Sequence, residues 1–335
     1  MTQIIPENQT AATIPVICGP TASGKSAIAM WLSLRREIVV INADSRQIYR
    51  GFDLGTSKPT PDERTRVRHC GIDVADPMER YSAAQWAALA GRAIHEAMEA
   101  RRIPIVVGGT GFYIGALFRP LWEQPPHDAE RRAAIQGALA DHSTEELRRW
   151  CAALDPARAH LGRAQLLRAV EVALLTGVPL SELHVAHARS PAYRASYLLV
   201  DPGAELASRI AIRATAMLDA GWADEVRHLI DVVPADAPAW NAAGYEVVRR
   251  HVLGELDRSA TLDRVVIETR QYAKRQRTWF RHQLEHDRVQ RLVSGAPGWQ
   301  EAVDRWITEL EATMHTSSRE SRASRESGEL GERVR

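Results

Sequence analysis

One loop constrains the fold of this chain more than any other stretch. It follows the apolar run 14–18 and reads Gly19, Pro20, Thr21, Ala22, Ser23, Gly24, Lys25 and Ser26. This order fits G-x-x-x-x-G-K-[S/T], and residues 27–32 can continue it as a helix. A strand, a glycine-containing loop and a helix together predict a phosphate-binding loop (P-loop), in which backbone N–H groups, the Lys25 ammonium and the helix start surround an anion. The Ser26 hydroxyl is the expected protein ligand of a Mg²⁺ ion that bridges two phosphates.

The composition narrows the class of protein. A chain of 335 residues, of which 45% are hydrophobic, can bury one large core with an insertion, or two modest domains. The net charge of +1 means that any affinity for nucleic acid must come from a local patch. The three cysteines, Cys18, Cys70 and Cys151, are far apart, which argues against a disulfide framework or a zinc site and fits a reducing compartment. Because no segment resembles a signal peptide or a transmembrane helix, we expect a cytoplasmic protein with no membrane contact.

Two further apolar runs, 37–43 and 103–107, are short and apolar on both faces. Such runs are typical of strands in a parallel sheet covered by helices. Each is followed by residues suited to a functional site, Asp44-Ser45-Arg46-Gln47 after the first and Gly108-Gly109-Thr110-Gly111 after the second. Ligands of open α/β sheets bind at this edge, so we expect the loops to meet. Between the two runs, residues 81–101 show helical spacing, with Ser82 as the expected cap.

The pattern changes at about Pro125. Helical periodicity without intervening strands covers 129–139, 144–154 and 161–175, whereas 196–200 again resembles a strand and helices are expected from 204 to about 310. We therefore predict an α/β fold, a P-loop three-layer core with a parallel sheet and an all-helical insertion. The predicted domains are a flexible N-terminus at 1–12, the core at 13–124 and 190–312, the insertion at 125–189 and a disordered tail at 316–335.

The residues after the strands suggest a reaction at a bound phosphate. Asp44 is the only acidic residue in the first three strand-end loops, where phosphate-transferring enzymes keep a carboxylate for a metal or as a base. Thr110 offers a hydroxyl in the same crevice. Plain alternatives are that Asp44 caps a turn or organises the metal, and that Thr110 is a turn residue. The loop at 19–26 could instead be a simple glycine-containing turn between a strand and a helix. Even as a phosphate-binding loop, its sequence does not identify which phosphate compound is bound.

Taken together, these residues resemble the tRNA dimethylallyltransferases of bacterial type, also called tRNA isopentenyl transferases. The resemblance covers about residues 13–312 and rests on G-P-T-A-S-G-K-S at 19–26, D-S-R-Q-I-Y-R-G at 44–51, D-L-G-T-S-K-P at 53–59, G-G-T-G-F-Y at 108–113, R-A-V-E-V at 168–172, R-I-A-I-R at 209–213, G-W-A-D-E-V at 221–226 and T-R-Q-Y-A-K-R-Q-R-T-W-F at 269–280. P-loops occur in many proteins. The segments that begin at residues 44 and 269 are far more diagnostic.

The resemblance implies transfer of a dimethylallyl group from dimethylallyl diphosphate to the exocyclic amine of the adenosine 3′ of the anticodon in tRNA. The chemistry of the residues agrees, because Lys25, the loop amides and Mg²⁺ at Ser26 would neutralise the leaving diphosphate. An adenine amine is a poor nucleophile, and Asp44 is the expected base that takes its proton. The resemblance also places Thr110 beside the reacting atoms.

The acceptor needs its adenine turned out of the anticodon loop. By resemblance, the target nucleotide is contacted by Asp44, Ser45, Arg46, Gln47 and Thr110, and the tRNA side also includes Arg132, Gln165 and Arg168. The segment 264–288 mixes aromatic residues with Arg270, Lys274, Arg275, Arg277 and Arg281, a composition typical of RNA recognition. The alternative is an amphipathic helix whose aromatic side chains face the core. We expect a monomer that binds the tRNA anticodon stem-loop.

The chain also departs from the family pattern in three places. Leu161-Gly162-Arg163-Ala164-Gln165 stands where the family usually has Asn-Asp, Pro202 where it commonly has Arg, and Ala243-Gly244-Tyr245-Glu246 for its I-G-Y-K/R block. These positions concern the insertion and the tRNA side.

Three other functions are compatible with parts of the sequence. A small-molecule kinase would bind ATP and would have no need of the basic and aromatic segment near residue 275. A transferase acting on free AMP or ADP would share the fold, but the insertion and the long C-terminal region favour a macromolecular acceptor. An RNA-binding protein with an inactive P-loop is disfavoured, because Lys25, Ser26, Asp44 and Thr110 are all present.

Overall fold

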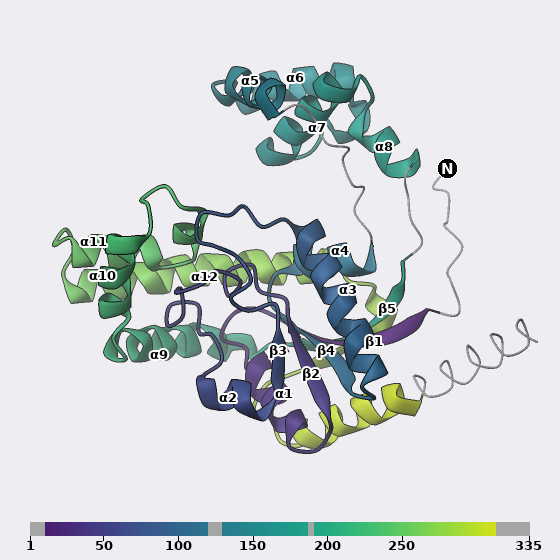
Figure 1. The fold of residues 1–335 in the computed structure, drawn as a ribbon, viewed down its shortest axis with the longest axis vertical. Coiled ribbons are helices and arrows are strands. Elements are labelled where there is room, and N and C mark those ends of the chain that lie inside the picture. Colours follow the sequence, from purple (N-terminus) through teal and green to yellow (C-terminus); the bar gives the residue numbers. More distant parts are fainter. Residues whose placement is uncertain (1–10, 120–128, 187–190, 313–335) are drawn as a thin grey trace, which may run out of the picture. The chain divides into compact units, whose positions relative to one another are not determined.

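The computed structural model describes residues 11–119, 129–186 and 191–312 (Figure 1). The predictions for residues 1–10 and for the tail at 316–335 fall outside these ranges. The chain divides into two compact units. The described residues 11–118 and 191–312 form the α/β core, and residues 119 and 129–186 belong to a helical unit.

The core is built on a six-stranded parallel sheet. Its strands are β1 (Ala12–Cys18), β2 (Ile38–Asn42), β3 (Arg68–Cys70), β4 (Ile103–Gly108), β5 (Tyr193–Val200) and β6 (Val289–Leu292). They are ordered β3-β2-β4-β1-β5-β6, and every neighbouring pair is parallel. All carboxyl ends therefore lie at one edge, where the loops after the strands meet.

The strands predicted at 14–18, 37–43, 103–107 and 196–200 are confirmed as β1, β2, β4 and β5. The sequence pattern does not predict β3 and β6. β3 has three residues, and only Leu292 of β6 is fully buried, so neither strand carries an apolar run, as is usual at the edges of a sheet. The expectation that only helices follow residue 204 is wrong, because β6 pairs with β5.

Helices cover both faces of the sheet, so the predicted three-layer core is confirmed. On one face, α1 (Lys25–Ser33) and a helix at 299–312 share an apolar cluster with Leu198 of β5. On the other face lie α3 (Ala83–Glu99) and α4 (Gly111–Phe118), and Phe118 contacts the ring of Tyr197, the neighbour of Leu198. The predicted cap of α3 is confirmed, because the Ser82 hydroxyl accepts a hydrogen bond from the Gln85 amide at 3.2 Å.

Four helices extend the core on one side of the sheet (Figure 1). They are α9 (Leu206–Asp219), α10 (Trp222–Val232), α11 (Tyr245–Val252) and α12 (Arg258–Gln283). The last of these, α12, contacts α4, α9 and α11 and carries the basic and aromatic segment. It has 26 residues, yet neither it nor any other helix in the described ranges is long and apolar enough to cross a membrane. A short helix, α2 (Pro61–Arg66), precedes β3.

The helical unit contains the predicted helices at 129–139, 144–154 and 161–175. They are α5 (Ala129–Ala140), α6 (Thr144–Leu154) and α7 (Arg163–Thr176), followed by α8 (Leu180–Ala186). Their small core is made by Leu139, Leu147, Cys151, Leu166, Ala169 and Val170. This unit therefore buries an apolar cluster of its own.

Candidate active site

The loop at 19–26 lies between β1 and α1, as predicted for a P-loop. Gly24, with a φ of +93°, turns the chain into α1. A side chain at Gly19 would place its Cβ 2.1 Å from the carbonyl oxygen of Val200 at the end of β5, so only glycine fits there. Ala22 also has a left-handed backbone, with a φ of +59°, which is uncommon for a residue with a side chain. The loop thus keeps a tight conformation against the neighbouring strand.

Lys25 points back over this loop. Its Nζ atom donates a hydrogen bond to the Pro20 carbonyl at 2.6 Å and another to the Ser23 hydroxyl at 3.4 Å. Burial lowers the pKa of Lys25 to about 8, and the negative charge of Asp44 acts in the opposite direction. A bound anion would favour the protonated ammonium, so Lys25 is placed to respond to a phosphate ligand.

The lowered pKa of Lys25 makes anion binding depend on pH. Only protonated Lys25 attracts the ligand, so its contribution to the affinity for inorganic pyrophosphate is expected to be full below pH 8 and to be lost as the pH rises through about 8. Between pH 7 and pH 9 the expected loss, measured relative to the Lys25→Met variant, is about tenfold, since roughly one Lys25 side chain in ten stays protonated at the higher value. Isothermal titration calorimetry at the two pH values measures this loss. In the Lys25→Met variant, only the titration of the ligand itself should change the affinity with pH. If the wild type and Lys25→Met show the same pH dependence, the loss of affinity does not come from Lys25.

The loops after β2 and β4 form one hydrogen-bonded unit. The Thr110 hydroxyl accepts a hydrogen bond from the Ser45 amide at 2.9 Å and donates one to the Ser45 hydroxyl at 3.2 Å. The Thr110 amide donates to the Ala43 carbonyl at 3.0 Å. Asp44 accepts a hydrogen bond from the Arg46 amide at 2.9 Å. The structure therefore brings Asp44, Ser45 and Thr110 together, as expected for the ends of neighbouring strands.

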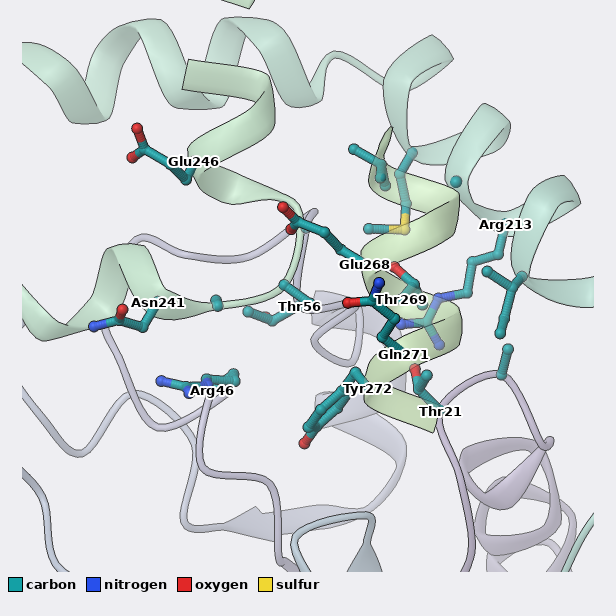
Figure 2. Close-up of a pocket in the computed structure, with 18 of the residues that line it drawn as sticks. Thr21, Arg46, Thr56, Arg213, Asn241, Glu246, Glu268, Thr269, Gln271 and Tyr272 are labelled. Carbon is teal, nitrogen blue, oxygen red and sulfur yellow. The ribbon is translucent and has the colours of Figure 1, made fainter. Parts of the chain in front are cut away.

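Two cavities meet at Asp44. The first, of about 450 Å³, is lined by residues 21–26 and by Gly108 and Gly109, and we call it the P-loop cavity. The second, of about 520 Å³, is lined by Arg46, by residues of α9 and α12 and by residues 240–243, and we call it the α12 cavity (Figure 2). The residues that line both are Thr21, Ala22, Asp44, Thr56 and Arg213. Among the described residues, Asp44 is the one acidic side chain common to both cavities.

Arg213 of α9 is a site residue that the sequence pattern did not identify. Its side chain points into the α12 cavity (Figure 2) and also lines the P-loop cavity. Burial lowers the pKa of its guanidinium, and the negative charge of Asp44 opposes this effect. The segment R-I-A-I-R at 209–213 could have revealed Arg213, because Arg209 and Arg213 are one helical turn apart on the same face. Both side chains line the P-loop cavity. A guanidinium here offers several N–H donors to an anion.

Aromatic and basic side chains of α12 border the second cavity. Burial raises the pKa of the Tyr272 hydroxyl, which lies beside Thr110, to about 12, and the charge of Asp44 adds to the effect. The guanidinium of Arg275 lies 5.8 Å from the centroid of the Tyr272 ring. Phe280 is buried, so for this residue the alternative of an aromatic side chain facing the core is correct. Trp279 packs on Gly111, where a Cβ atom would lie 2.2 Å from its ring.

The segment 53–59 is fixed beside the P-loop cavity. Lys58, whose side chain is 2% exposed, pairs with Asp53 at 2.6 Å and with Asp73 at 2.5 Å. Gln47, a predicted tRNA contact, donates hydrogen bonds to the carbonyl groups of Thr56 and Ser57, both at 3.0 Å. The side-chain carboxamide of Gln47 therefore holds this segment in place. The contact of Gln47 with a nucleotide stays a prediction.

Glu225 of α10 and Tyr245 of α11 hold the same segment from the other side. The Glu225 carboxylate accepts a hydrogen bond from the Leu54 amide at 2.7 Å and one from the Tyr245 hydroxyl at 2.6 Å. Burial raises the pKa of Glu225. Tyr245 also accepts a hydrogen bond from the Gly55 amide at 3.1 Å. Tyr245 belongs to one of the segments that depart from the family pattern, and it connects the C-terminal helices to the wall of the site.

The residues present fit a Mg²⁺ ion that is held together with a bound diphosphate. The exposed Ser26 lines the P-loop cavity together with Asn42 and Asp44. Within the described ranges, no group of three or more His, Cys, Asp or Glu side chains is placed to hold a metal on its own. Mg²⁺ commonly combines few protein oxygens with substrate phosphates and several waters. Binding of this ion would therefore depend on the substrate.

The predicted tRNA contacts on α12 have different surroundings. Lys274 and Arg275 are exposed. Arg277 is half-buried, and its Nε atom donates to the carboxylate of Asp201, after β5, at 2.9 Å. Its Nη2 atom donates to the Gly203 carbonyl at 2.7 Å. The guanidinium of Arg277 is therefore bound to the loop after β5, and its contact with tRNA stays a prediction, as does that of the other two residues.

Two predicted tRNA contacts in the helical unit converge on one carboxylate. Arg132 and Arg168 each pair with Glu171 at 2.8 Å, and Glu171 is buried in α7. Gln165 accepts a hydrogen bond from the Gly162 amide at 3.1 Å at the start of this helix. Glu171, which the sequence pattern did not single out, therefore orients both arginines. The role of all three predicted residues in tRNA binding stays a prediction.

The sequence of this chain matches two models of known protein families. A family model described as IPP transferase matches residues 47–283, and one described as isopentenyl transferase matches residues 12–76. The first match spans well over half of the chain. The chain belongs to the IPP transferase family. This membership confirms the resemblance found in the sequence, and the helical unit at 129–186 lies inside the region that the family shares.

Individual relatives in this family agree over most of the length. The tRNA dimethylallyltransferase of Anaeromyxobacter dehalogenans is 41% identical over 272 residues, which cover 79% of this chain and 91% of the relative. The tRNA dimethylallyltransferase of Thermus thermophilus is 39% identical over 81% of this chain and 90% of its own. The solved structure of a tRNA isopentenylpyrophosphate transferase from Bacillus halodurans has a TM-score of 0.65 and 28% identity, with 93% of this chain and 99% of that chain covered. The fold is therefore that of other IPP transferases.

Proposed function

We propose that this IPP transferase transfers a dimethylallyl group from dimethylallyl diphosphate to the exocyclic amine of the adenosine 3′ of the anticodon in tRNA. The products are isopentenyladenosine in the tRNA and inorganic diphosphate. The observation that carries the proposal is the position of Asp44, where the P-loop cavity meets the α12 cavity. The names of the relatives, tRNA dimethylallyltransferases, support the class of reaction.

On the donor side, the diphosphate would lie against Lys25 and the start of α1, where the helix adds partial positive charge. Arg213 adds a full charge on the side that faces the α12 cavity. These charges stabilise the leaving group while the bond between carbon and the diphosphate oxygen breaks, because negative charge on the diphosphate grows in the transition state. When Mg²⁺ is bound at Ser26, it supplies further neutralisation of that charge.

On the acceptor side, an adenine in the α12 cavity would bring its amine to Asp44. The nitrogen lone pair forms the new bond to carbon, and the proton that the nitrogen loses passes to the carboxylate of Asp44. Thr110, which is fixed by Ser45, is placed to hydrogen-bond the amine or the oxygen that leaves with the diphosphate. The ring of Tyr272 gives the turned-out base an apolar surface.

The exposed cationic face of α12 would bind the backbone of the anticodon stem-loop. Replacing Lys274 with alanine is expected to weaken binding at all sequences and to reduce the slope of log affinity against log salt by about 0.7–1, because one phosphate contact is lost. Fluorescence anisotropy at several salt concentrations measures the slope. The matched control is Arg66→Ala. Arg66 is exposed and lies just before β3, at the amino-terminal edge of the sheet, whereas the site lies at the carboxyl-terminal edge. A slope that Lys274→Ala leaves unchanged would place this residue outside the interface.

Transfer assays test the proposed reaction against its alternatives. Purified protein is incubated with Mg²⁺ and labelled dimethylallyl diphosphate, with unmodified tRNA in one tube and AMP in another. Label on tRNA alone is the expected result. Label on AMP would indicate a free-nucleotide transferase, and hydrolysis or tight binding of ATP without any transfer would indicate a kinase.

We further propose that the enzyme works as a cytoplasmic monomer. Lys25, Asp44 and Arg213, to which the proposal assigns the reaction, line these cavities from within one chain. Light scattering after size-exclusion chromatography, with and without an anticodon stem-loop, tests the monomeric state.

A further inference from the structure

We propose that Gln276 of α12 is a positioning residue, which holds the P-loop in the backbone conformation that binds diphosphate. The inference rests on the proposed function in one respect, that the P-loop is the diphosphate site. It assigns to α12 a task besides RNA binding, namely the shape of the donor site.

The carboxamide of Gln276 connects two strand-end loops. Its side chain is buried, and its Oε1 atom accepts a hydrogen bond from the Thr21 amide of the P-loop at 2.8 Å. Its Nε2 atom donates to the carbonyl of Gly109, after β4, at 2.9 Å. A Cβ atom at Gly109 would lie 2.3 Å from this nitrogen, so the carboxamide lies directly on the backbone of that loop. A backbone group engages each polar atom of the carboxamide, which also lines the P-loop cavity. We assign the effect of Gln276 on a ligand to the two loops that it holds.

The residue after Thr21 shows why the loop needs such support. Ala22 has a φ of +59°, a left-handed conformation that is unfavourable for a residue with a Cβ atom. Backbone strain of this kind persists only where the surroundings impose it. Gln276 holds Thr21, and Ala273, one turn earlier on α12, belongs to the apolar cluster against which Ala22 packs. The turn that leads into Ser23 and Lys25 is therefore held at Thr21 by Gln276, and at Ala22 it packs against a cluster to which α9 and α12 both contribute.

The next residue of α12 anchors this helical turn to the sheet. Arg277 binds the carboxylate of Asp201 and the carbonyl of Gly203, in the loop after β5. The end of β5, from which this loop starts, lies against the P-loop, since the Val200 carbonyl oxygen leaves no room for a side chain at Gly19. One turn of α12 thus contacts the loops after β1, β4 and β5, and the position of Gln276 is fixed relative to all three.

The direct test measures the binding of inorganic pyrophosphate by calorimetry, with the full-length protein and without tRNA. Gln276→Ala is expected to lower the affinity at least about tenfold, because two buried hydrogen bonds that shape the loop are lost. Ala22→Gly removes the strain, so in the Gln276→Ala background it is expected to restore most of the lost affinity. A residue that only stabilised the fold would not show this rescue. Thr278→Ala, an exposed change on the same helix, is the matched control and is expected to bind like the wild type.

The outcomes separate this inference from the proposed function. Suppose that the wild type binds pyrophosphate. If Gln276→Ala then binds it equally well, or if Ala22→Gly does not restore the affinity that Gln276→Ala loses, the role of Gln276 is overturned and the proposed function is not affected. A wild-type protein that does not bind pyrophosphate would remove the proposed donor site and this inference with it. If Gln276→Ala does not fold, Gln276→Met provides the same test, because methionine keeps the volume and removes both hydrogen bonds.

Discussion

Replacing Asp44 with alanine is expected to slow the transfer step by about 10²–10⁴-fold, the range that a positioned general base contributes. The affinity for tRNA should stay close to that of the wild type, because the cationic contacts proposed for α12 are untouched. The reason for the large effect is the position of Asp44, which borders both cavities. Single-turnover kinetics with saturating tRNA and donor measure the step without product release.

Asp44→Asn is the matched variant for this prediction. Asparagine keeps the shape of the side chain and the oxygen that accepts a hydrogen bond from the Arg46 backbone amide. It cannot, however, take a proton from the adenine amine. An equally slow asparagine variant, whose rate does not recover at high Mg²⁺, supports the role of base. Recovery at high Mg²⁺ would make Asp44 an organiser of the metal, and loss of tRNA binding with an intact rate would remove it from the chemistry.

Replacing Arg213 with alanine is expected to lower kcat by about 10²–10³-fold, the range seen when one donor to a developing anion is removed. Arg213 lines both cavities and lies within the field of Asp44, so its guanidinium would follow the charge that moves onto the diphosphate. Steady-state kinetics with varied dimethylallyl diphosphate separate kcat from KM. The loss is expected in kcat, since the interaction strengthens as the bond breaks.

Arg213→Lys distinguishes charge from geometry in this prediction. Lysine keeps the positive charge but loses the planar set of N–H donors, so an intermediate rate is expected. Unchanged kcat and unchanged affinity for pyrophosphate in Arg213→Ala would show that this residue does not contact the donor.

Local patterns in the sequence predict much of the core, for a physical reason. β1, β2, β4 and β5 are interior strands of the sheet and therefore read as apolar runs, and Ser82 caps its helix through a contact three residues away. β3 and β6 are edge strands with exposed polar residues, so their sequences do not differ from those of loops. Only pairing with β2 and β5, which depends on the whole fold, makes them strands.

The candidate site was predicted where it follows the strands and missed where it depends on helix docking. Asp44 and Thr110 meet because parallel strands end at one edge of the sheet. Arg213 and Gln276 reach the same place from α9 and α12, and local periodicity does not specify how those helices pack. Arg277 lies in a segment whose composition is typical of RNA contacts, and the structure adds a bond to Asp201, 76 positions away in the chain, that this composition does not predict. The pattern of charges in a sequence does not show whether an arginine pairs with a carboxylate of the protein or with an RNA phosphate.

The central claim is that the adenosine 3′ of the anticodon receives the dimethylallyl group at Asp44. The most direct measurement uses two anticodon stem-loops that differ only in this nucleotide, adenosine in one and guanosine in the other, with labelled dimethylallyl diphosphate. The RNA is digested to nucleosides, and the labelled nucleoside is identified by chromatography and mass spectrometry. Label in an N6-modified adenosine from the first stem-loop, and in nothing from the second, is the predicted result. Equal label in both stem-loops, or label at another position of the first, would contradict the account.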